Sequence, residues 1–164
     1  MKPISRQLMS AVFMLFSMGA KPQAVTSQLN SDHWSPAQLL ERARHLRQLA
    51  AEGDGSASET LEKYPRHSTM LAFRSRSGGG ELHKHYADLF YILDGHATLL
   101  TGGEVADAHT VADGEVRGSA VKGGARQDLK PGDVAHIPAG MAHQMLIADG
   151  ETVTYFVVKI QEGQ

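Results

Sequence analysis

The chain has 164 residues, of which 41% are hydrophobic and 21% charged, and its formal net charge is −2. This composition is typical of an ordinary globular protein with room for one domain, and the lack of a basic stripe argues against nucleic acid as a partner. The sequence has no cysteine. A disulfide framework is therefore excluded, and any metal ion must be held by histidine and carboxylate side chains.

Residues 1–20 have the pattern of a secretory signal peptide. Lys2 and Arg6 precede an apolar run from Leu8 to Phe16, and small residues follow up to Ala20. The run is too short for a stable membrane span. We therefore expect cleavage near Ala20, a periplasmic or secreted protein and no stable membrane anchor after processing. The alternative is an uncleaved N-terminal membrane tether or a frayed apolar tail. Loss of the two basic residues would change the net charge from −2 to −4.

Residues 21–55 predict a linker followed by one helix. Ser35 is a good helix cap, Pro36 suits the first turn, and Gln38 completes a capping pattern. Apolar residues then recur at helical spacing, and Gly53 supplies the end of the helix. The single apolar stripe indicates that this helix covers one edge or open face of the main domain.

Residues 56–164 predict the main domain, which is built from strands. Short segments rich in Val, Ile, Thr, Phe and Tyr alternate with glycine clusters and Pro-Gly. Many short strands with frequent turn signals favour a β-sandwich or β-barrel. Residues 102–114 read as a loop inserted between hairpin strands. The expected strands lie near 58–64, 67–76, 81–85, 88–93, 97–101, 115–121, 126–129, 133–137, 142–147 and 152–160.

The segment 81–85 carries the strongest chemical signal. Glu81, His83 and His85 occupy alternate positions, with Lys84 between the two histidines. Side chains in a strand alternate between its faces, so these three would share one face and Lys84 would point away. Two imidazoles on one face can both reach a divalent ion. A carboxylate and a third imidazole from elsewhere would complete a mixed nitrogen and oxygen site.

Two segments, 83–95 and 131–143, together resemble the two motifs of the cupin superfamily. The first motif has two histidines one residue apart, an acid, six residues and a glycine, which here are His83, His85, Asp88 and Gly95. The second has a glycine, Pro-x-Gly and a histidine, which here are Gly132, Pro138, Gly140 and His143. The resemblance extends from about residue 69 to 159. It implies an all-β fold, the double-stranded β-helix or jelly-roll barrel, with one N-terminal helix.

The resemblance also implies a divalent metal ion (Fe, Mn, Zn or Ni) held by His83, His85, Asp88 and His143. Residue 88 is aspartate where the family has glutamate, and the spacer after His85 is short. Three roles therefore stay open for Asp88: direct ligand, hydrogen-bond partner of the ligands, or cap of the next strand. Glu81 is the substitute ligand. A metal-free barrel that keeps these residues as pocket lining is the alternative.

Cupins host many functions, so the resemblance is weaker for activity than for fold. It implies a small-molecule enzyme of dioxygenase or isomerase type, without naming catalytic residues. The alternatives are a non-catalytic cupin that binds a metal or small ligand, and a purely structural domain. A homodimer is implied by resemblance only. Arg117 and Arg126 are either clamps for an anionic substrate or surface charges. One of Phe90 and Tyr91 must face the barrel interior.

Overall fold

A computed structural model describes residues 31–162, and the predicted signal peptide lies outside them. From His33 on the chain forms one compact unit. Within the described residues, no helix combines the length and the apolar character that a membrane span needs. The elements are α1 (Pro36–Glu52), β1 (Ser56–Lys63), β2 (His67–Arg74), β3 (Gly80–His83), β4 (Tyr86–Gly95), β5 (Ala97–Thr101), β6 (Glu104–Ala106), β7 (His109–Ala112), β8 (Glu115–Gly118), β9 (Ala120–Lys122), β10 (Ala125–Leu129), β11 (Val134–Ile137), β12 (His143–Leu146) and β13 (Val153–Gln161).

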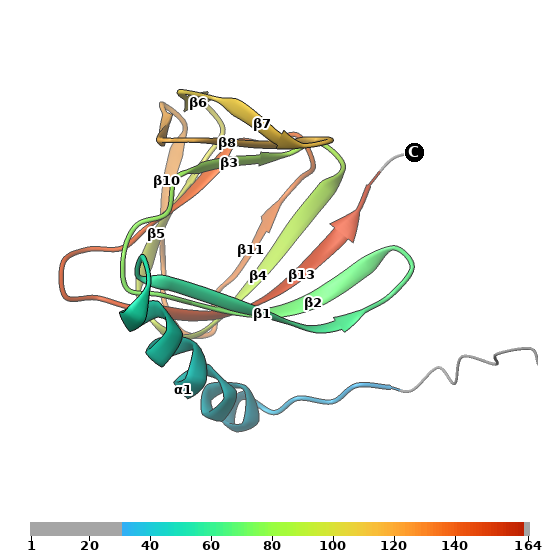
Figure 1. The fold of residues 1–164 in the computed structure, drawn as a ribbon, viewed down its shortest axis with the longest axis vertical. Helices are drawn as coiled ribbons and strands as arrows, with labels where there is room; N and C mark the ends of the chain where they lie inside the picture. Colours follow the sequence, from blue (N-terminus) through green and yellow to red (C-terminus); the bar gives the residue numbers. More distant parts are fainter. Residues whose placement is uncertain (1–30, 163–164) are drawn as a thin grey trace, which may run out of the picture. The chain divides into compact units, whose positions relative to one another are not determined.

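The strands form two antiparallel sheets that curve around a common interior (Figure 1). The first sheet has the order β1-β2-β13-β4-β11, and the second has the order β10-β5-β12-β3-β8-β7. Strands β6 and β9 pair separately. The chain passes from one sheet to the other several times, so residues far apart in sequence face each other across the interior. The prediction of an all-β barrel with one N-terminal helix is confirmed.

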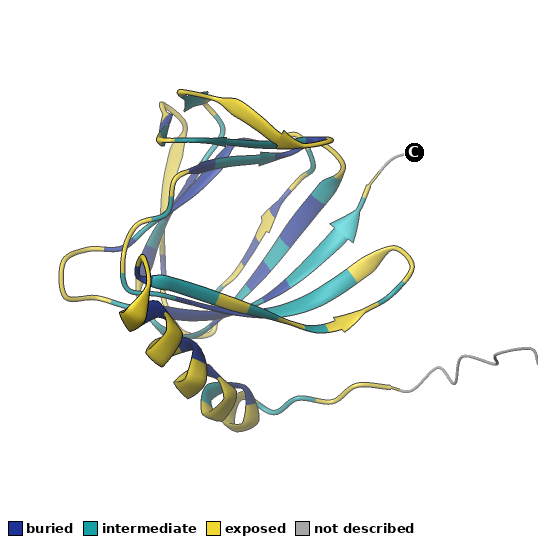
Figure 2. Cartoon of the chain, in the orientation of Figure 1, coloured by how far each residue is buried: buried dark blue, intermediate teal, exposed yellow. Residues whose placement is uncertain are grey.

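Strand alternation divides the apolar residues between two cores. On β2, Ala72 belongs to the core between the sheets, whereas its neighbours Leu71 and Phe73 pack with the buried stripe of α1. Figure 2 shows that stripe on the side of the helix that faces the sheet. The predicted helix start is confirmed, because the Ser35 hydroxyl accepts from the Gln38 backbone N–H and the Gln38 side chain accepts from the Ser35 N–H.

The expectation of a plain loop over residues 102–114 is wrong. This segment contains β6, which pairs with β9, and β7, which pairs with β8. All four residues of β7 are exposed, so the strand has no buried face and leaves no alternating apolar pattern in the sequence. The expected strand 115–121 is likewise two strands, β8 and β9, which belong to different sheets.

Candidate metal centre

Three neighbouring strands of the second sheet bring the first half of the site together. Glu81 on β3 lies opposite His143 on β12 and opposite Arg117 on β8. Two residues further along β3, His83 lies opposite Glu115. Directly opposed residues in an antiparallel pair have neighbouring side chains, and residues two apart share a face. The strand register thus gathers two imidazoles, two carboxylates and one guanidinium on one face.

The other sheet contributes an acid and a cation. Asp88 on β4 lies opposite Lys159 on β13, and 2.9 Å separates Asp88 Oδ1 from Lys159 Nζ. The pair meets the distance for an ion pair, but neither atom has a well-directed hydrogen bond to the other. Asp88 is 4% exposed, so its charge is held out of water. The second oxygen of Asp88 remains available to face β3 and β12.

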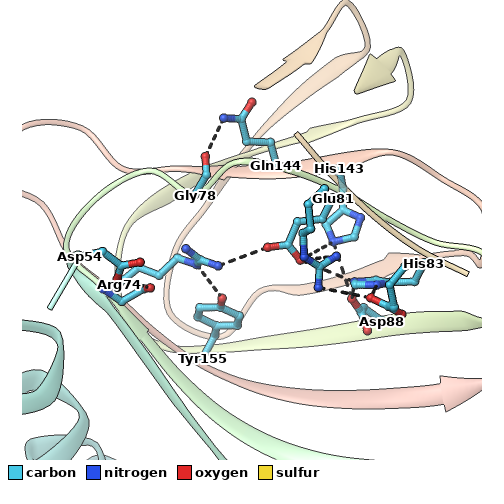
Figure 3. A network of polar contacts seen from close by, with 12 residues as sticks. Asp54, Arg74, Gly78, Glu81, His83, Asp88, His143, Gln144 and Tyr155 are labelled. Carbon is cyan, nitrogen blue, oxygen red and sulfur yellow. Dashed lines mark hydrogen bonds and ion pairs between the residues drawn. The ribbon is translucent and has the colours of Figure 1, made fainter. Parts of the chain in front are cut away.

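The two halves meet in one buried cluster (Figure 3). The Nε2 atom of His83 lies 3.3 Å from Asp88 Oδ2 and 3.6 Å from Glu81 Oε2, and His143 Nε2 lies 3.7 and 4.0 Å from the same two oxygens. Ligand atoms about 2.1 Å from one ion lie roughly 3.0–3.5 Å apart. The ligand atoms of Glu81, His83 and His143 all lie within 4.8 Å of one another. The contacts of 3.3–4.0 Å exceed the spacing around a bound ion by up to about 1 Å, so the side chains must move inward to hold a divalent ion.

Both imidazoles are oriented so that Nδ1 has a hydrogen-bond acceptor and Nε2 faces the cluster. His83 Nδ1 lies 2.6 Å from Glu115 Oε2, and His143 Nδ1 lies 3.3 Å from the carbonyl oxygen of Met141. Each acceptor favours a proton on Nδ1 and so leaves the Nε2 lone pair directed at the cluster. A metal-bound histidine typically has this arrangement, with its second nitrogen donating to a carboxylate or carbonyl.

Burial and neighbouring charges set the protonation states of the cluster. Burial would lower the pKa of His83, but contacts with Asp88 and Glu81 outweigh it and raise that pKa to about 9. Burial would raise the pKa of Glu81, but contacts with His83, Arg117 and His143 lower it to about 2. Burial lowers the pKa of His143. Near neutral pH the metal-free site thus holds one imidazolium between two carboxylates, where a divalent ion can replace the proton.

The structure does not bring His85 to this cluster, and the expected strand over 81–85 is too long. β3 ends at His83, and the chain bends through Lys84 and His85 before β4 begins at Tyr86 in the other sheet. This two-residue corner breaks the alternation, so His85 is exposed and its ring lies beside the backbone of Gly114. Lys84 is exposed, as expected.

Both carboxylates that the sequence offered as alternatives lie in the cluster. Asp88 Oδ2 is the nearer of the two to each imidazole, and Glu81 reaches both imidazoles from the same strand as His83. Neither acid caps a strand end, because Asp88 is the third residue of β4 and Glu81 is the second of β3.

A cavity of about 440 Å³ opens beside the cluster, and Glu81, His83 and Asp88 line it. Arg74, Arg117 and Lys159 supply positive charge to the same wall. The Tyr155 hydroxyl also faces the cavity and accepts a hydrogen bond from Arg74 Nε at 3.1 Å. Burial raises the pKa of Tyr155, so the phenol keeps its proton.

Sequence reasoning missed four residues of this wall and cluster. Arg74 lies two residues after the core residue Ala72 on β2, so both point to the same face of the strand. On β13, Tyr155 and Lys159 stand two residues before and after the core residue Val157 and share its face. A polar or charged residue at an inward-facing position of an otherwise apolar strand was the signal that could have identified these three. The fourth, Glu115, begins a short strand and carries no comparable signal.

The structure also decides between the residue pairs that the sequence left open. Phe90 is buried and packs edge-on against His143 and Tyr155, so it is the interior member of the pair with Tyr91. Arg117 lines the cavity, whereas Arg126 is exposed on β10 and does not. Gly140 has φ +80°, and its N–H donates to the His83 carbonyl at 2.8 Å. The turn before His143 is therefore tied to β3.

Comparisons with known proteins support the fold. No family model matches the chain. No curated protein matches it by sequence either. Among solved structures, an uncharacterized conserved protein with a double-stranded β-helix domain from Klebsiella pneumoniae has a TM-score of 0.54 at 15% identity, over 80% of this chain and 91% of its own. The cupin domain of Schizosaccharomyces pombe Cnp3 has a TM-score of 0.50 at 14% identity, over 65% of each chain.

The DMSP lyase DddQ from Ruegeria pomeroyi is similar at a TM-score of 0.49 and 16% identity, over 66% of this chain. The match spans about half of the lyase, 48% of its length. At such identities the likeness concerns the fold and not the activity. The chain has the double-stranded β-helix fold of the cupin proteins, as its two motifs predicted.

Proposed function

We propose that this protein binds a divalent metal ion (Fe, Mn, Zn or Ni) through His83, His143 and Glu81, with Asp88 as the fourth ligand. The observation that carries the proposal is the orientation of the imidazoles. Both Nδ1 atoms have acceptors, and both Nε2 atoms face the same two carboxylate oxygens. With both imidazoles neutral, the Nε2 lone pairs and the carboxylate oxygens face one another with no donor between them. A metal ion can fill this place, and near neutral pH a proton on His83 is the substitute.

We further propose that the bound metal serves a reaction on a small organic molecule, of dioxygenase or isomerase type. A divalent ion held by nitrogen and oxygen ligands can polarise a carbonyl group and, if it is iron, activate oxygen. The cavity of about 440 Å³ is lined by three of the proposed ligands, so a small molecule can reach them. Part of its wall, which includes Phe90 and Val157, is apolar, so an apolar portion of such a molecule can pack there.

The residues around the cluster would hold the metal ligands in place rather than react themselves. Glu115 fixes the ring of His83, and Lys159 fixes one oxygen of Asp88. The Tyr155 hydroxyl accepts from Arg74 and retains its own proton for donation into the cavity. These contacts preorganise the ligands, which is the contribution a protein makes to metal-dependent catalysis.

The first test is the stoichiometry and location of the metal. Metal-free protein would be titrated with Co²⁺ and Zn²⁺ by calorimetry and visible absorption, and protein purified from its own compartment would be analysed for its elements. We expect one ion per chain in the wild type and in His85→Ala, the matched control, and strongly reduced binding in His143→Ala. Equal binding by all three proteins would contradict the proposed centre.

The second test separates an enzyme from a binding protein. Metal-loaded protein would be screened for oxygen consumption and, by nuclear magnetic resonance, for isomerisation of small organic acids. An enzyme should lose turnover when the metal is removed and regain it on reloading. Stabilisation by a ligand without any turnover would support the non-catalytic alternative instead.

We also propose export of the protein with removal of residues 1–20, on the basis of the basic and apolar pattern at the start of the sequence. N-terminal sequencing of the protein recovered from the periplasm or medium tests this. A mature chain that still begins at Met1 would contradict it. A homodimer remains a prediction, which light scattering of the mature protein can test.

A further inference from the structure

The cavity beside the cluster has a cationic wall whose hydrogen-bonding capacity is largely unused. Two arginines line this wall, and Arg74 is the more buried: 19% of its side chain is exposed, against 36% for Arg117. A guanidinium carries five N–H donors. Among the described residues, Arg74 makes one hydrogen bond, from Nε to the Tyr155 hydroxyl. Its Nη2 atom also lies 3.5 Å from Glu81 Oε1, which is long for a hydrogen bond, and the Asp54 carboxylate is a second acidic neighbour.

The surroundings of Arg74 are built to hold the guanidinium in place. A Cβ atom added to Gly78 would lie 2.8 Å from Arg74 Nη1 and 3.1 Å from Cζ, so the guanidinium lies against bare backbone. That backbone is fixed on both sides. The Gly78 N–H donates to the Met145 carbonyl at 2.9 Å, and the buried Gln144 side chain donates to the Gly78 carbonyl at 2.7 Å (Figure 3). The guanidinium is therefore held in place on the cavity wall, where Arg74 is one of the lining residues.

The charges around the cavity do not balance once a divalent ion is bound. Glu81, Asp88 and Glu115 are offset by three cations, Arg74, Arg117 and Lys159. With a divalent ion bound and both imidazoles neutral, the net charge of these groups is +2. It is +1 if the exposed Asp54, which also lines the cavity, is counted. Uncompensated charge in a partly buried cavity is unfavourable, so an anion is the ligand that this wall favours.

The remainder of the cavity wall is apolar. Met70, Ala72, Phe90 and Val157 line it, and the last three are buried. A simple inorganic anion would leave this surface in contact with water. A volume of about 440 Å³ is in the lower part of the range for small-molecule sites, roughly 300–1,000 Å³. The wall thus matches a molecule with one anionic end and a small apolar body.

We propose that the cavity binds a small organic acid, with its carboxylate held by the Arg74 fork and the Tyr155 hydroxyl, and its apolar body against Phe90 and Val157. This inference rests on the metal centre proposed above, because the ion supplies the excess positive charge. An arginine fork suits a carboxylate because it can donate two parallel hydrogen bonds. Arg117, which already contacts Glu115 at 3.2 Å, adds charge at the more exposed side.

The test uses Co²⁺-loaded full-length protein, and Co²⁺ binding is measured first. Propionate, hexanoate and benzoate are then titrated alongside their uncharged amides, while the visible Co²⁺ spectrum and the melting temperature are recorded. We expect at least one carboxylate to bind and its amide to bind at least tenfold more weakly. Arg74→Gln should weaken carboxylate binding tenfold or more, while Co²⁺ affinity changes by threefold or less.

Three further variants keep the result interpretable. Arg74→Lys retains the charge without the fork, and Gly78→Ala displaces the fork without removing the charge; both should weaken carboxylate binding. Arg126→Gln, on the exposed strand β10, should behave like the wild type. If Arg74→Gln fails to fold, the Lys and Gly78 variants decide the matter.

Failure of the wild type to bind Co²⁺ would overturn the metal centre and this inference with it. Normal Co²⁺ binding with no carboxylate effect, with equal binding of the amides, or with undiminished binding in the Arg74 and Gly78 variants would overturn this inference alone.

Discussion

His83 and His85 stand two residues apart, and the fold gives them opposite surroundings. His83 is 4% exposed, with Glu115 on one nitrogen and two carboxylates facing the other. His85 is exposed in the bend that carries the chain to the other sheet. The spacing of two residues places side chains on one face only while the strand continues. The end of a strand therefore decides whether a two-histidine motif supplies one metal ligand or two.

The largest expected effect contrasts these two residues directly. His83→Ala should reduce Zn²⁺ or Co²⁺ affinity more than about 100-fold, because it removes a ligand whose orientation is fixed. His85→Ala should change the affinity by less than about threefold. Titration of both metal-free variants by calorimetry measures the difference. If His85→Ala lost as much affinity as His83→Ala, His85 would be a ligand and β3 would continue to residue 85 in the metal-bound protein.

The next effect asks whether both sheets contribute ligands. Asp88→Asn and Glu81→Gln should each reduce metal affinity by about 10- to 100-fold, since both remove a charged oxygen that faces the two imidazoles. Competition with a coloured chelator measures each affinity. If Asp88 served only as the partner of Lys159, its substitution would lower the melting temperature and leave the affinity unchanged.

The pH dependence of metal binding gives a sharper test of the His83 environment. Its pKa of about 9 lies above the ordinary value, so the metal-free imidazole carries a proton at lower pH that the metal must displace. Affinity should rise about tenfold per pH unit from roughly pH 7 to 8. Calorimetry in buffers with different ionisation enthalpies should show release of about one proton per ion at pH 7. An affinity that does not change over this range would contradict the raised pKa.

The smallest effect concerns the turn that returns the chain to the site. Gly140 and Gly150 both have φ +80°, and an added Cβ would meet nothing within 4 Å at either position. A β-branched residue should therefore destabilise each turn by a similar amount, about 1–2 kcal/mol. Only Gly140 bonds to the His83 carbonyl, so Gly140→Val alone should weaken metal binding, by about threefold. Thermal melts and metal titrations of both variants make the comparison, and equal metal affinities would contradict it.

Much of the fold could be predicted because its signals are local. The capping pattern at Ser35 and Gln38 was enough to place the helix start, and glycine and proline clusters separated most of the strands. The exposed β7 was missed because neither face of it is buried, which leaves the sequence without alternation. Such a strand is stabilised by pairing, here with β8, and pairing leaves no pattern of apolar residues within the strand itself.

The sequence by itself determined the chemical inventory: no thiolate, a histidine pair with nearby acids, a distant His143 after a turn, and the barrel that these motifs imply. Tertiary structure decided which of these residues meet. Register set Glu81 beside His143 and Asp88 beside Lys159, and a two-residue corner removed His85. The physical reason is that the proposed metal ligands come from two sheets that pack face to face. Which residues meet between the sheets depends on where each strand ends and on its register, and contacts across the whole domain fix both.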